Sequence, residues 1–475
     1  MTKKINYYLV LLVFMGFYTY FYNYQNPPKQ IWDENYHIAS AQKYIDHIAF
    51  MEPHPPLGKM LIALGEVILH PNKGIDKSNF DRTDYIKNFP KNLSFSGYRF
   101  FPTLFAWLNI VLFFFILNEL VKSDILAFLG SFLYLFDNAI IVHSRTAMLE
   151  PIQLFFIFCS ILWFVKKSET KREWEDYLIL GIFSGLALMV KANSAILFLL
   201  FLIWAFKDLK IIELAKIVTK SIAYAFGVGI IFLGVFYLHF ALGKKLPTHK
   251  KYAFSKEYIS IIKKNGVANP LNFTTMLKDN LKYMKNYEKG VPKLNLCKPG
   301  ENGSLFIGWP LGIKAINYRW EKHGPLVKYI YLQGNPVTWA IGAMASFLSI
   351  VLIVGVIVFN TPIKNTRIFE YILSFTFIYI SYMTAVGMIP RVMYLYHYFI
   401  PLTISYILAI LLLYYLFEEE IKKNDKIVLF SIVLIASAIV FTWWFYSPLS
   451  YYKPLTLEEF NQRIWLGYWQ LHPIR

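Results

Sequence analysis

The segment from Ile31 to Glu66, IWDENYHIASAQKYIDHIAFMEPHPPLGKMLIALGE, concentrates acids, histidines and a double proline directly after the first apolar run. Asp33 and Glu34 are adjacent, and neighbouring side chains on a helix point about 100° apart, so these carboxylates serve two different partners. The simpler alternative is a solvated helix start, where the helix dipole favours acids. Asp33 and His37 are also spaced like two ligands of a metal site, but the sequence offers no recognisable third ligand.

The second half of this segment predicts a platform for that chemistry. Pro55 and Pro56 suit the start of a helix, where a missing amide proton costs little. The following apolar residues recur at helical spacing and predict an amphipathic helix along the membrane surface: Leu57, Met60, Leu61, Leu64, Val67 and Ile68. His54, just before the prolines, is either a polar group delivered to a cleft or an ordinary loop residue.

Further ionisable groups stand where apolar runs meet. The stretch LFDNAIIVHSRTAMLE holds Asp137, Arg145 and Glu150, and IPRVMYLYHYFIP holds Arg391 and His397. Charged groups beside hydrocarbon are costly unless paired or hydrated, so they are functional candidates by default. The alternative for Arg145 is a structural pair with an acid, whereas its planar guanidinium would also suit a lipid phosphate.

The elements that must position these residues are membrane helices. The chain has 475 residues, is 56% hydrophobic and only 16% charged, and its apolar residues fall in long runs. Backbone hydrogen bonding in lipid then makes the spans helical. We predict about eleven spans, at 7–25, 99–119, 125–136, 151–165, 177–190, 194–206, 221–241, 336–359, 369–386, 394–415 and 427–446.

Lys and Arg in alternate loops predict a cytoplasmic N-terminus and two long outside segments. The sequence thus divides into a transmembrane module 1–241 with an outside loop 26–98, a basic outside loop 242–335, and a C-terminal transmembrane module with its tail, 336–475. The loop 242–335 holds 17 Lys and Arg against 5 Asp and Glu, which is +12 of the chain's net charge of +18. This surplus predicts attraction to something anionic, with acidic lipid headgroups as the simplest partner; nucleic acid is not expected.

The motifs together resemble those of the protein O-mannosyltransferase family. In order along the chain they are WDENYHIASAQKYI, HPPLGKMLIALGE, DNAIIVHSRTAMLE, IGWPLGIKAINYRWE with YIYLQGNPVTWA, and YLYHYFIP. The resemblance covers most of residues 31–402. It implies an all-α polytopic membrane protein of the GT-C glycosyltransferase fold, with the active site on extracytoplasmic loops and a polyprenyl-phosphate sugar as donor.

The resemblance also implies roles for individual residues. Asp33 matches the acid that contacts the acceptor hydroxyl and would be the general base, and Glu34 would orient its surroundings. Arg145 and Glu150 match an arginine and an acid on the donor side. As a hypothesis about the mechanism, apart from the resemblance, Arg391 or His397 would assist Arg145 against the phosphate. The supporting residues are His54, Lys59, Asp137 and Lys191.

Two departures from the family pattern are visible. Glu150 stands where Asp is common, which keeps the charge but moves it by about one methylene. The segment 242–335 is too short for the β-trefoil insert of eukaryotic members, so the chain looks like the bacterial branch, in the bacterial inner membrane.

The expected reaction is inverting transfer of a sugar, mannose above all, to a Ser or Thr hydroxyl of a protein at the outer face. An alternative is transfer to an envelope lipid or glycan, as by an aminoarabinose transferase. A remoter alternative is a secondary transporter. Transporters are commonly built from paired repeats of spans, and the spans predicted here show no such repeat, which argues against this class. No cofactor is assigned. A divalent ion is left open because some relatives on this fold need one, although the sequence shows no convincing ligand set.

Overall fold

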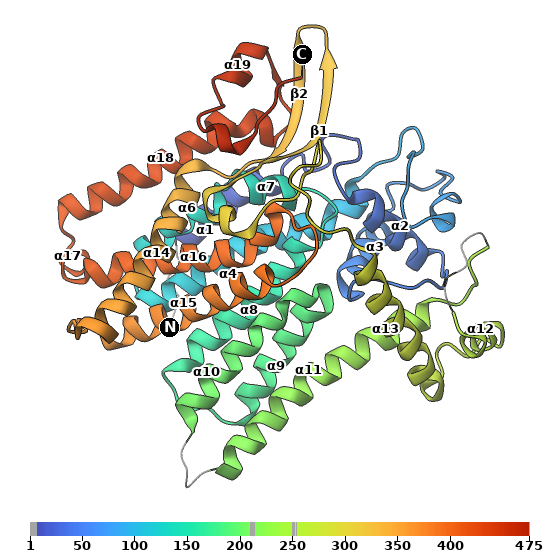
Figure 1. Cartoon of the computed structure of the whole chain (residues 1–475), viewed down its shortest axis with the longest axis horizontal. Coiled ribbons are helices and arrows are strands. Elements are labelled where there is room, and N and C mark those ends of the chain that lie inside the picture. The colour runs from blue at the N-terminus through green and yellow to red at the C-terminus, as the bar shows by residue number, and fades with distance from the viewer. Residues whose placement is uncertain (1–6, 210–213, 249–251, 253, 475) are drawn as a thin grey trace. The chain divides into compact units, whose positions relative to one another are not determined.

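The computed structural model describes residues 7–209, 214–248, 252 and 254–474. The chain forms two compact units. Figure 1 shows the helices and strands of both units, coloured by residue number. Unit 1 consists of the described residues of Met1–Tyr22, Trp107–His143 and Pro292–Arg475, and unit 2 consists of those of Asn23–Ala106 and Ser144–Val291. The three-part division of the sequence at residues 241 and 335 stays a prediction.

The regular elements among the described residues of unit 2 are helices, joined by turns and irregular segments. Its elements are α2 (Glu34–Ile45), α3 (Leu57–Leu69), η2 (Phe80–Arg82), the start of α4 (Ser96–Val121), α8 (Glu150–Ser168), α9 (Trp174–Val190), η3 (Ala192–Leu197), α10 (Phe198–Asp208), α11 (Leu214–Leu242), α12 (Lys256–Lys263), η5 (Pro270–Asn272) and α13 (Phe273–Gly290). One hydrophobic core joins α2 and α3 to the ends of α9 and α11 and to the inner faces of α12 and α13.

Close helix packing fixes the membrane part of unit 2. A side chain at Gly181 of α9 would collide with the backbone of Tyr224 on α11, and one at Gly227 would collide with that of Leu178. Glycines at these two positions therefore let α9 and α11 approach backbone to backbone, as small residues do between membrane helices.

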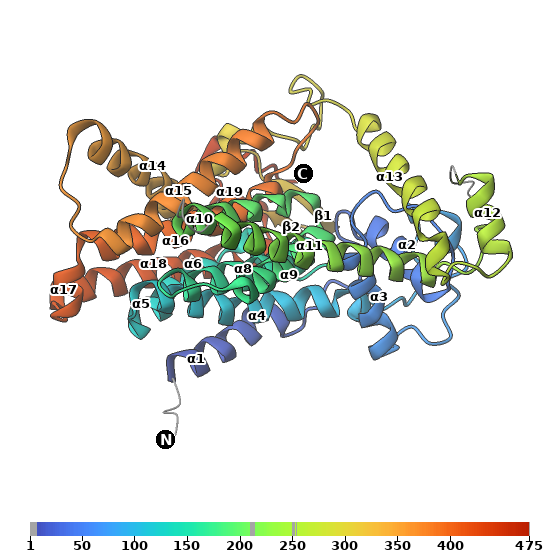
Figure 2. The same ribbon diagram turned by 90° about the horizontal axis from the view of Figure 1, so that it is seen from below.

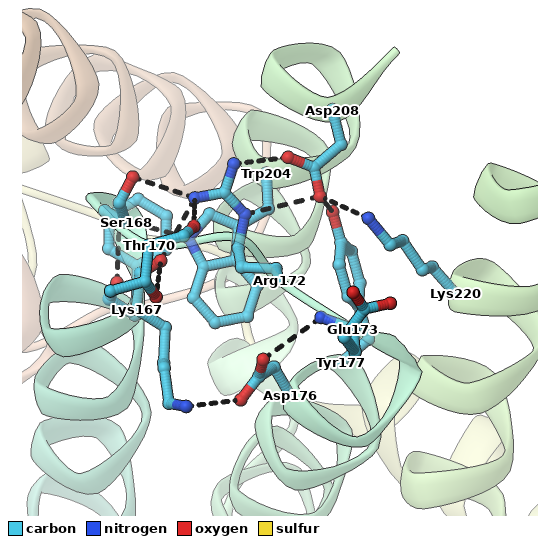
Figure 3. A network of polar contacts seen from close by, with 11 residues as sticks. Lys167, Ser168, Thr170, Arg172, Glu173, Asp176, Tyr177, Trp204, Asp208 and Lys220 are labelled. Carbon is cyan, nitrogen blue, oxygen red and sulfur yellow. Dashed lines mark hydrogen bonds and ion pairs between the residues drawn. The ribbon is translucent and has the colours of Figure 1, made fainter. Parts of the chain in front are cut away.

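A polar network connects the end of α8, the start of α9, the end of α10 and the start of α11 (Figure 3). Both Arg172, in the α8–α9 connection, and Lys220 of α11 pair with Asp208 at the end of α10, Lys220 at 2.8 Å. Tyr177 donates its hydroxyl hydrogen bond to Asp208 over 2.9 Å, and Arg172 donates to the carbonyl of Ser168 over 2.8 Å. These basic residues belong to the loops that we predicted to be cytoplasmic, and here they hold four helices in register.

Unit 1 combines helices with a small sheet. Its elements are α1 (Tyr7–Gly16), the π-helix η1 (Phe17–Phe21), the rest of α4, α5 (Asp124–Gly130), α6 (Phe132–Leu135), α7 (Asn138–Ser144), η6 (Phe306–Leu311), β1 (Ile316–His323), β2 (Leu326–Leu332), α14 (Pro336–Phe359), α15 (Thr366–Gly387), η7 (Leu395–Tyr398), α16 (Phe399–Leu416), α17 (Glu418–Lys422), α18 (Lys426–Ser450), β3 (Pro454–Leu455), α19 (Leu457–Asn461) and η8 (Gly467–Trp469). The helices α14, α15 and α16 lie side by side (Figures 1 and 2).

The sheet of unit 1 is antiparallel, in the order β1-β2-β3. It packs through Tyr329 and Tyr331 against Phe460 of α19, and the same small core includes Tyr446 and Leu449 of the long helix α18. Asn335 follows β2 and begins α14: its side chain accepts from the amide of Val337 over 3.0 Å, with Pro336 at the first helical position. The sheet is an addition to the helical fold that the sequence predicts.

Seven helices among the described residues are long and apolar enough to cross a membrane: Ser96–Val121, Glu150–Ser168, Leu214–Leu242, Pro336–Phe359, Thr366–Gly387, Leu395–Leu416 and Lys426–Ser450. The helices Asp124–Leu135 and Asn138–Ser144 together make an eighth candidate, bent by 65°. The prediction of a helical membrane protein is thus confirmed, but the count of eleven spans is not.

The predicted spans that do not reach this length have individual explanations. Tyr7–Phe21 is a shorter apolar helix, and α9 has 17 residues. The predicted span 194–206 is divided into η3 and α10 because the helix type changes at Phe198. The stretch that we predicted to be a loop between Asp137 and Glu150 is helical over Asn138–Ser144.

Candidate active site

Asp33 lies at the N-terminus of α2, preceded by a strained residue. Trp32 has φ +47°, a left-handed conformation that a bulky side chain rarely adopts. Asp33 occupies the N-cap position of α2, yet its carboxylate makes no capping hydrogen bond to the helix. The carboxylate therefore does not serve as a helix cap, and a strained residue directly before it is typical of functional sites.

Glu34, by contrast, is fully committed to structure. It is completely buried, and its two oxygens accept from Nε and Nη2 of Arg99 over 2.6 and 2.8 Å. The same oxygens accept from the amides of Ile31, at 2.8 Å, and Ala147, at 2.9 Å. Glu34 thus joins three chain segments and holds the backbone on either side of Asp33, as expected for an orienting residue.

Arg99 is the residue that sequence reasoning missed. Its remaining N–H groups donate to the carbonyls of Gln25, Pro27 and Lys29 over 2.8 to 3.0 Å, so it fastens the segment that leads to Asp33. An arginine at the start of an apolar span, in GYRFFP, was a signal of the same kind as Arg145. A buried pair of this kind is costly to break because it leaves one charge uncompensated.

Helix α3 brings Lys59 to the neighbourhood of Asp33. A Cβ on Gly58 would lie 2.8 Å from Leu149 and 3.0 Å from Val190, the residues directly before Glu150 and Lys191. This close approach requires glycine. The Lys59 ammonium is buried, lies 2.5 Å from Glu52 and donates to Ser40 over 3.4 Å.

Glu150 and Lys191 form the opposite side of the cluster. They begin α8 and follow α9, and Lys191 Nζ lies 2.5 Å from Glu150 Oε1. Burial raises the pKa of Asp33 to about 6, and the negative charge of Glu150 contributes, while Lys191 and Lys59 oppose the shift. Asp33 therefore changes its charge near neutral pH, as a general base needs to.

His37, which we considered above only as half of a two-ligand metal site, belongs to the same cluster. Burial lowers its pKa well below the usual range, and the positive charges of Lys59 and His54 act in the same direction. Its imidazole is therefore neutral at pH 7. Its Nδ1 is buried with no hydrogen-bond partner among the residues that the structure describes. The backbone N–H of His54 donates to Glu52 over 3.3 Å, which links the HPP turn to the Lys59 pair.

Arg145 is also in unit 2, and its guanidinium is buried. Its Nη2 donates to the carbonyl of Asn23 over 2.8 Å. It thus contacts the chain leading toward Asp33.

Asp137 belongs to unit 1 and is a packing centre there. It is completely buried and accepts hydrogen bonds from Trp339 Nε1 at 2.6 Å, the Tyr406 hydroxyl at 2.8 Å and the Thr338 hydroxyl at 3.0 Å. The side chain connects the break before α7 with α14 and α16. Its position in the LFDN motif suggested a loop at a membrane surface, whereas the structure encloses it among helices.

His397 and Arg391 also belong to unit 1. His397 lies in η7, where its Nδ1 accepts from the Tyr394 amide over 3.1 Å and its ring stacks on Trp309. Arg391 lies beyond the end of α15 and lines a cavity. The described residues contain no group of three or more His, Cys, Asp or Glu side chains arranged to hold a metal ion.

Solved structures with the same architecture define the class of this fold. The S. cerevisiae protein O-mannosyltransferase Pmt1-Pmt2 complex bound to the sugar donor matches with a TM-score of 0.81 at 16% identity, covering 99% of this chain and 93% of that one. The oligosaccharyltransferase AglB from Archaeoglobus fulgidus matches with a TM-score of 0.52 at 11% identity, covering 98% and 59%. The protein is an integral membrane protein with the GT-C glycosyltransferase fold.

Sequence comparison then gives the family. The family model for dolichyl-phosphate-mannose-protein mannosyltransferase matches residues 10–245, and the model for the C-terminal four TMM region of protein-O-mannosyltransferase matches residues 277–469. The chain belongs to the protein O-mannosyltransferase family.

Curated relatives agree with this assignment over part of their length. Dolichyl-phosphate-mannose–protein mannosyltransferase 1 of Candida albicans is 32% identical over 187 residues, which is 38% of this chain and 20% of that protein. Protein O-mannosyl-transferase 1 of Danio rerio is 25% identical over 255 residues, 51% of this chain and 35% of that protein. The aligned regions thus span between a fifth and about a third of these relatives.

Proposed function

We propose that the chain is a protein O-mannosyltransferase that moves mannose from a polyprenyl-phosphate donor to a Ser or Thr hydroxyl of a protein, with inversion at the anomeric carbon. The observation that carries the proposal is the cluster around Asp33, a carboxylate with a pKa of about 6 beside Glu150, Lys191 and Lys59. Family membership supplies the reaction class. The active site lies outside the cytoplasm, the N-terminus inside, and the membrane is the bacterial inner membrane.

In this reaction the acceptor oxygen bonds to the anomeric carbon while the bond from that carbon to the phosphate oxygen breaks. Asp33 takes the proton of the acceptor hydroxyl, and the electron pair of the broken bond leaves with the phosphate. Lys59, Lys191 and Arg145 stabilise the departing negative charge. The neutral His37 donates or accepts a hydrogen bond with a hydroxyl of the bound sugar or acceptor.

One carboxylate suffices because the leaving phosphate is already a stable anion. A glycosidase, in contrast, needs a second carboxyl group to protonate a poor leaving group. Glu34 is not needed as a second base, and its four hydrogen bonds favour a positioning role. The role of Arg391 and His397 in binding the donor phosphate remains a prediction.

The test compares Asp33→Ala with the wild type in purified protein, using polyprenyl-phosphate mannose and a Ser/Thr-containing peptide. Transfer is expected to disappear while donor binding persists. Asp76→Ala, which removes an exposed acid of the same outside segment, is the matched control and retains transfer. Near-normal turnover in the Asp33 variant contradicts the assignment.

A second candidate for the acceptor is an acidic glycan or lipid of the cell envelope. The observation that favours it is a row of exposed lysines on α13. On α13 four exposed lysines recur at helical spacing on the face opposite the core: Lys278, Lys282, Lys285 and Lys289. Such a stripe suits a polyanion. Membranes supplied with radiolabelled polyprenyl-phosphate mannose distinguish the acceptors, because label enters either protein or the lipid and glycan fraction.

A further inference from the structure

The connection between α12 and α13 in unit 2 presents an apolar side chain to its surroundings. Leu271, in η5, is 86% exposed, which is the largest exposed fraction among the large apolar side chains of the described residues. A single exposed leucine is ordinary on a protein in water, so the neighbouring residues decide what this one contacts.

The connection is well held, so the exposure of Leu271 does not come from a loose loop. Asn272 Nδ2 donates to the carbonyl of Gly266 over 2.9 Å and closes the turn. On either side, Ile262 of α12 and Met276 of α13 are buried in the core of unit 2. The fold therefore directs Leu271 outward while both flanking helices are packed.

The membrane helix α11 lies beside this connection. Its exposed apolar side chains recur three or four residues apart and form one stripe: Val218, Ile222, Phe226, Ile230, Leu233 and Tyr237. At the end of the stripe, the Tyr237 hydroxyl donates to the carbonyl of Ala268 over 2.7 Å. Figures 1 and 2 show α13 beside the same end of α11. Because tyrosines at the ends of membrane helices commonly lie at the level of the headgroups, the connection lies where the lipid-facing stripe ends.

Positive charge accompanies the exposed leucine. Lys263 and Lys264 are exposed at the end of α12, and no Asp or Glu occurs between Tyr258 and Lys278. Anionic headgroups attract such cations, and a neighbouring apolar side chain is stabilised when it enters the edge of the hydrocarbon. A soluble polyanion would account for the lysines but not for Leu271, whereas a bilayer surface accounts for both.

The helix α13 connects this surface to the candidate active site. Asn280, on the buried face of α13, accepts from the amide of Glu52 over 3.1 Å and donates to its carbonyl over 3.4 Å. Glu52 in turn pairs with Lys59 at 2.5 Å. Whatever holds α13 in place therefore also supports the chain around Lys59.

We propose that residues 263–271 are an interfacial anchor that docks α12 and α13 on the lipid bilayer. Leu271 enters the edge of the hydrocarbon, and Lys263 and Lys264 bind the headgroups of anionic phospholipids. The anchor does not depend on the proposed sugar transfer, so it stands even if Asp33 has another role.

The first experiment needs no variant. The full-length protein is placed in nanodiscs of phosphatidylcholine and phosphatidylglycerol, together with a phosphatidylglycerol that carries a photoreactive group beside its headgroup. Crosslinks within residues 263–272 are expected. Labelling of the protein that leaves these residues free of crosslinks overturns the proposal.

The depth of Leu271 is measured with a fluorophore on Leu271→Cys, after both natural cysteines are replaced by Cys159→Ser and Cys297→Ser. Lipids with a nitroxide near the headgroup are expected to quench this label strongly. Phe226→Cys, on the α11 stripe, gives the reference for deep quenching, and Tyr85→Cys, an exposed residue between α3 and α4, gives the reference for water. A label at 271 that is quenched no more than the label at 85 contradicts the insertion of Leu271.

Variants then test the two lysines. Lys263→Gln with Lys264→Gln is expected to reduce crosslinking by the photoreactive phosphatidylglycerol about fivefold for each lysine removed. Lys289→Gln, which removes an exposed lysine at the other end of α13, is the matched control and keeps the wild-type labelling. Unchanged labelling in the double variant, or equal labelling of the wild type by a photoreactive phosphatidylcholine, contradicts the role of the lysines.

Discussion

The pH dependence of sugar transfer is expected to follow the ionisation of Asp33. With a pKa of about 6, a base retains about a tenth of its ionised form at pH 5, whereas an acid at the ordinary value of 3.8 would retain over about nine tenths. The acid limb of kcat/KM should therefore fall tenfold per pH unit below pH 6. The assay is the initial rate of transfer to a peptide acceptor between pH 4.5 and 8.

Two neighbours shift this limb in opposite directions, which makes the test specific. Glu150→Gln removes a negative charge that raises the pKa of Asp33, so the limb should move to lower pH. Lys191→Gln removes a cation that lowers it and leaves Glu150 unpaired, so the limb should move to higher pH. Lys422→Gln, which removes only the exposed partner of Glu418, should leave the profile unchanged. A limb near pH 4 in the wild type, or shifts of the first two variants in the same direction, would refute this account of the base.

Asp33→Asn should abolish transfer yet raise the thermal unfolding midpoint at pH 7. Folding raises the pKa of this carboxyl from 3.8 to about 6, so the ionised form reduces the stability of the folded protein above pH 6, and this cost is absent below pH 3.8. The neutral amide of Asn removes the cost. A lowered midpoint would contradict the pKa shift. Arg99→Leu should reduce the free energy of unfolding by about 3–5 kcal/mol, since Glu34 is left buried and unpaired; a loss below about 1 kcal/mol in detergent unfolding would rule this out. Asp137→Ala should cost about 1–3 kcal/mol, measured in the same way, because it leaves Trp339 Nε1 buried without an acceptor, whereas the Thr338 and Tyr406 hydroxyls keep the Asn335 carbonyl and Thr338 Oγ1 as acceptors. Gly58→Ala should lower transfer with intact secondary structure by circular dichroism, because the added methyl displaces α3 from Leu149 and Val190; wild-type rates would show that the close approach is not required.

The sequence predicted the membrane class, the family and the unit 2 candidates because those inferences depend on residue types and order. Asp33, His54, Lys59, Arg145, Glu150 and Lys191 come from four separate stretches, and the expected common membrane face was enough to group them. Whether each candidate acts in the reaction remains a prediction. The sequence could not show which charged residues form ion pairs with one another. Arg99 was interpreted as the first residue of the span 99–119, and its ion pair with Glu34 depends on tertiary packing.

The secondary structure of the connecting segments was also beyond sequence reasoning. We predicted that residues 242–335 form a basic loop. Among the described residues, this segment contains the helices α12 and α13 in unit 2 and the β-hairpin of β1 and β2 in unit 1. Lys278 to Lys289 could have shown the helical spacing of α13, since lysines four, three and four residues apart fall on one face. The helix Asn138–Ser144 had no such signal, because LFDNAII reads as the end of one apolar run followed by a loop.

Helix α3 explains why a site of this kind lies at a membrane surface. Its inward face carries Lys59 and Glu66 with two glycines, whereas Leu64, Val67 and Ile68 on the outward face are 41–54% exposed. In water this arrangement would be inverted, because apolar side chains are buried and charged ones exposed. It becomes favourable if the outward face meets lipid, and the position at a membrane surface that the apolar stripe indicates stays a prediction. One helix therefore has an apolar outward face on one side and the buried cation of the cluster on the other, and under the proposed function it would lie between the lipid-held donor and Asp33, the proposed base.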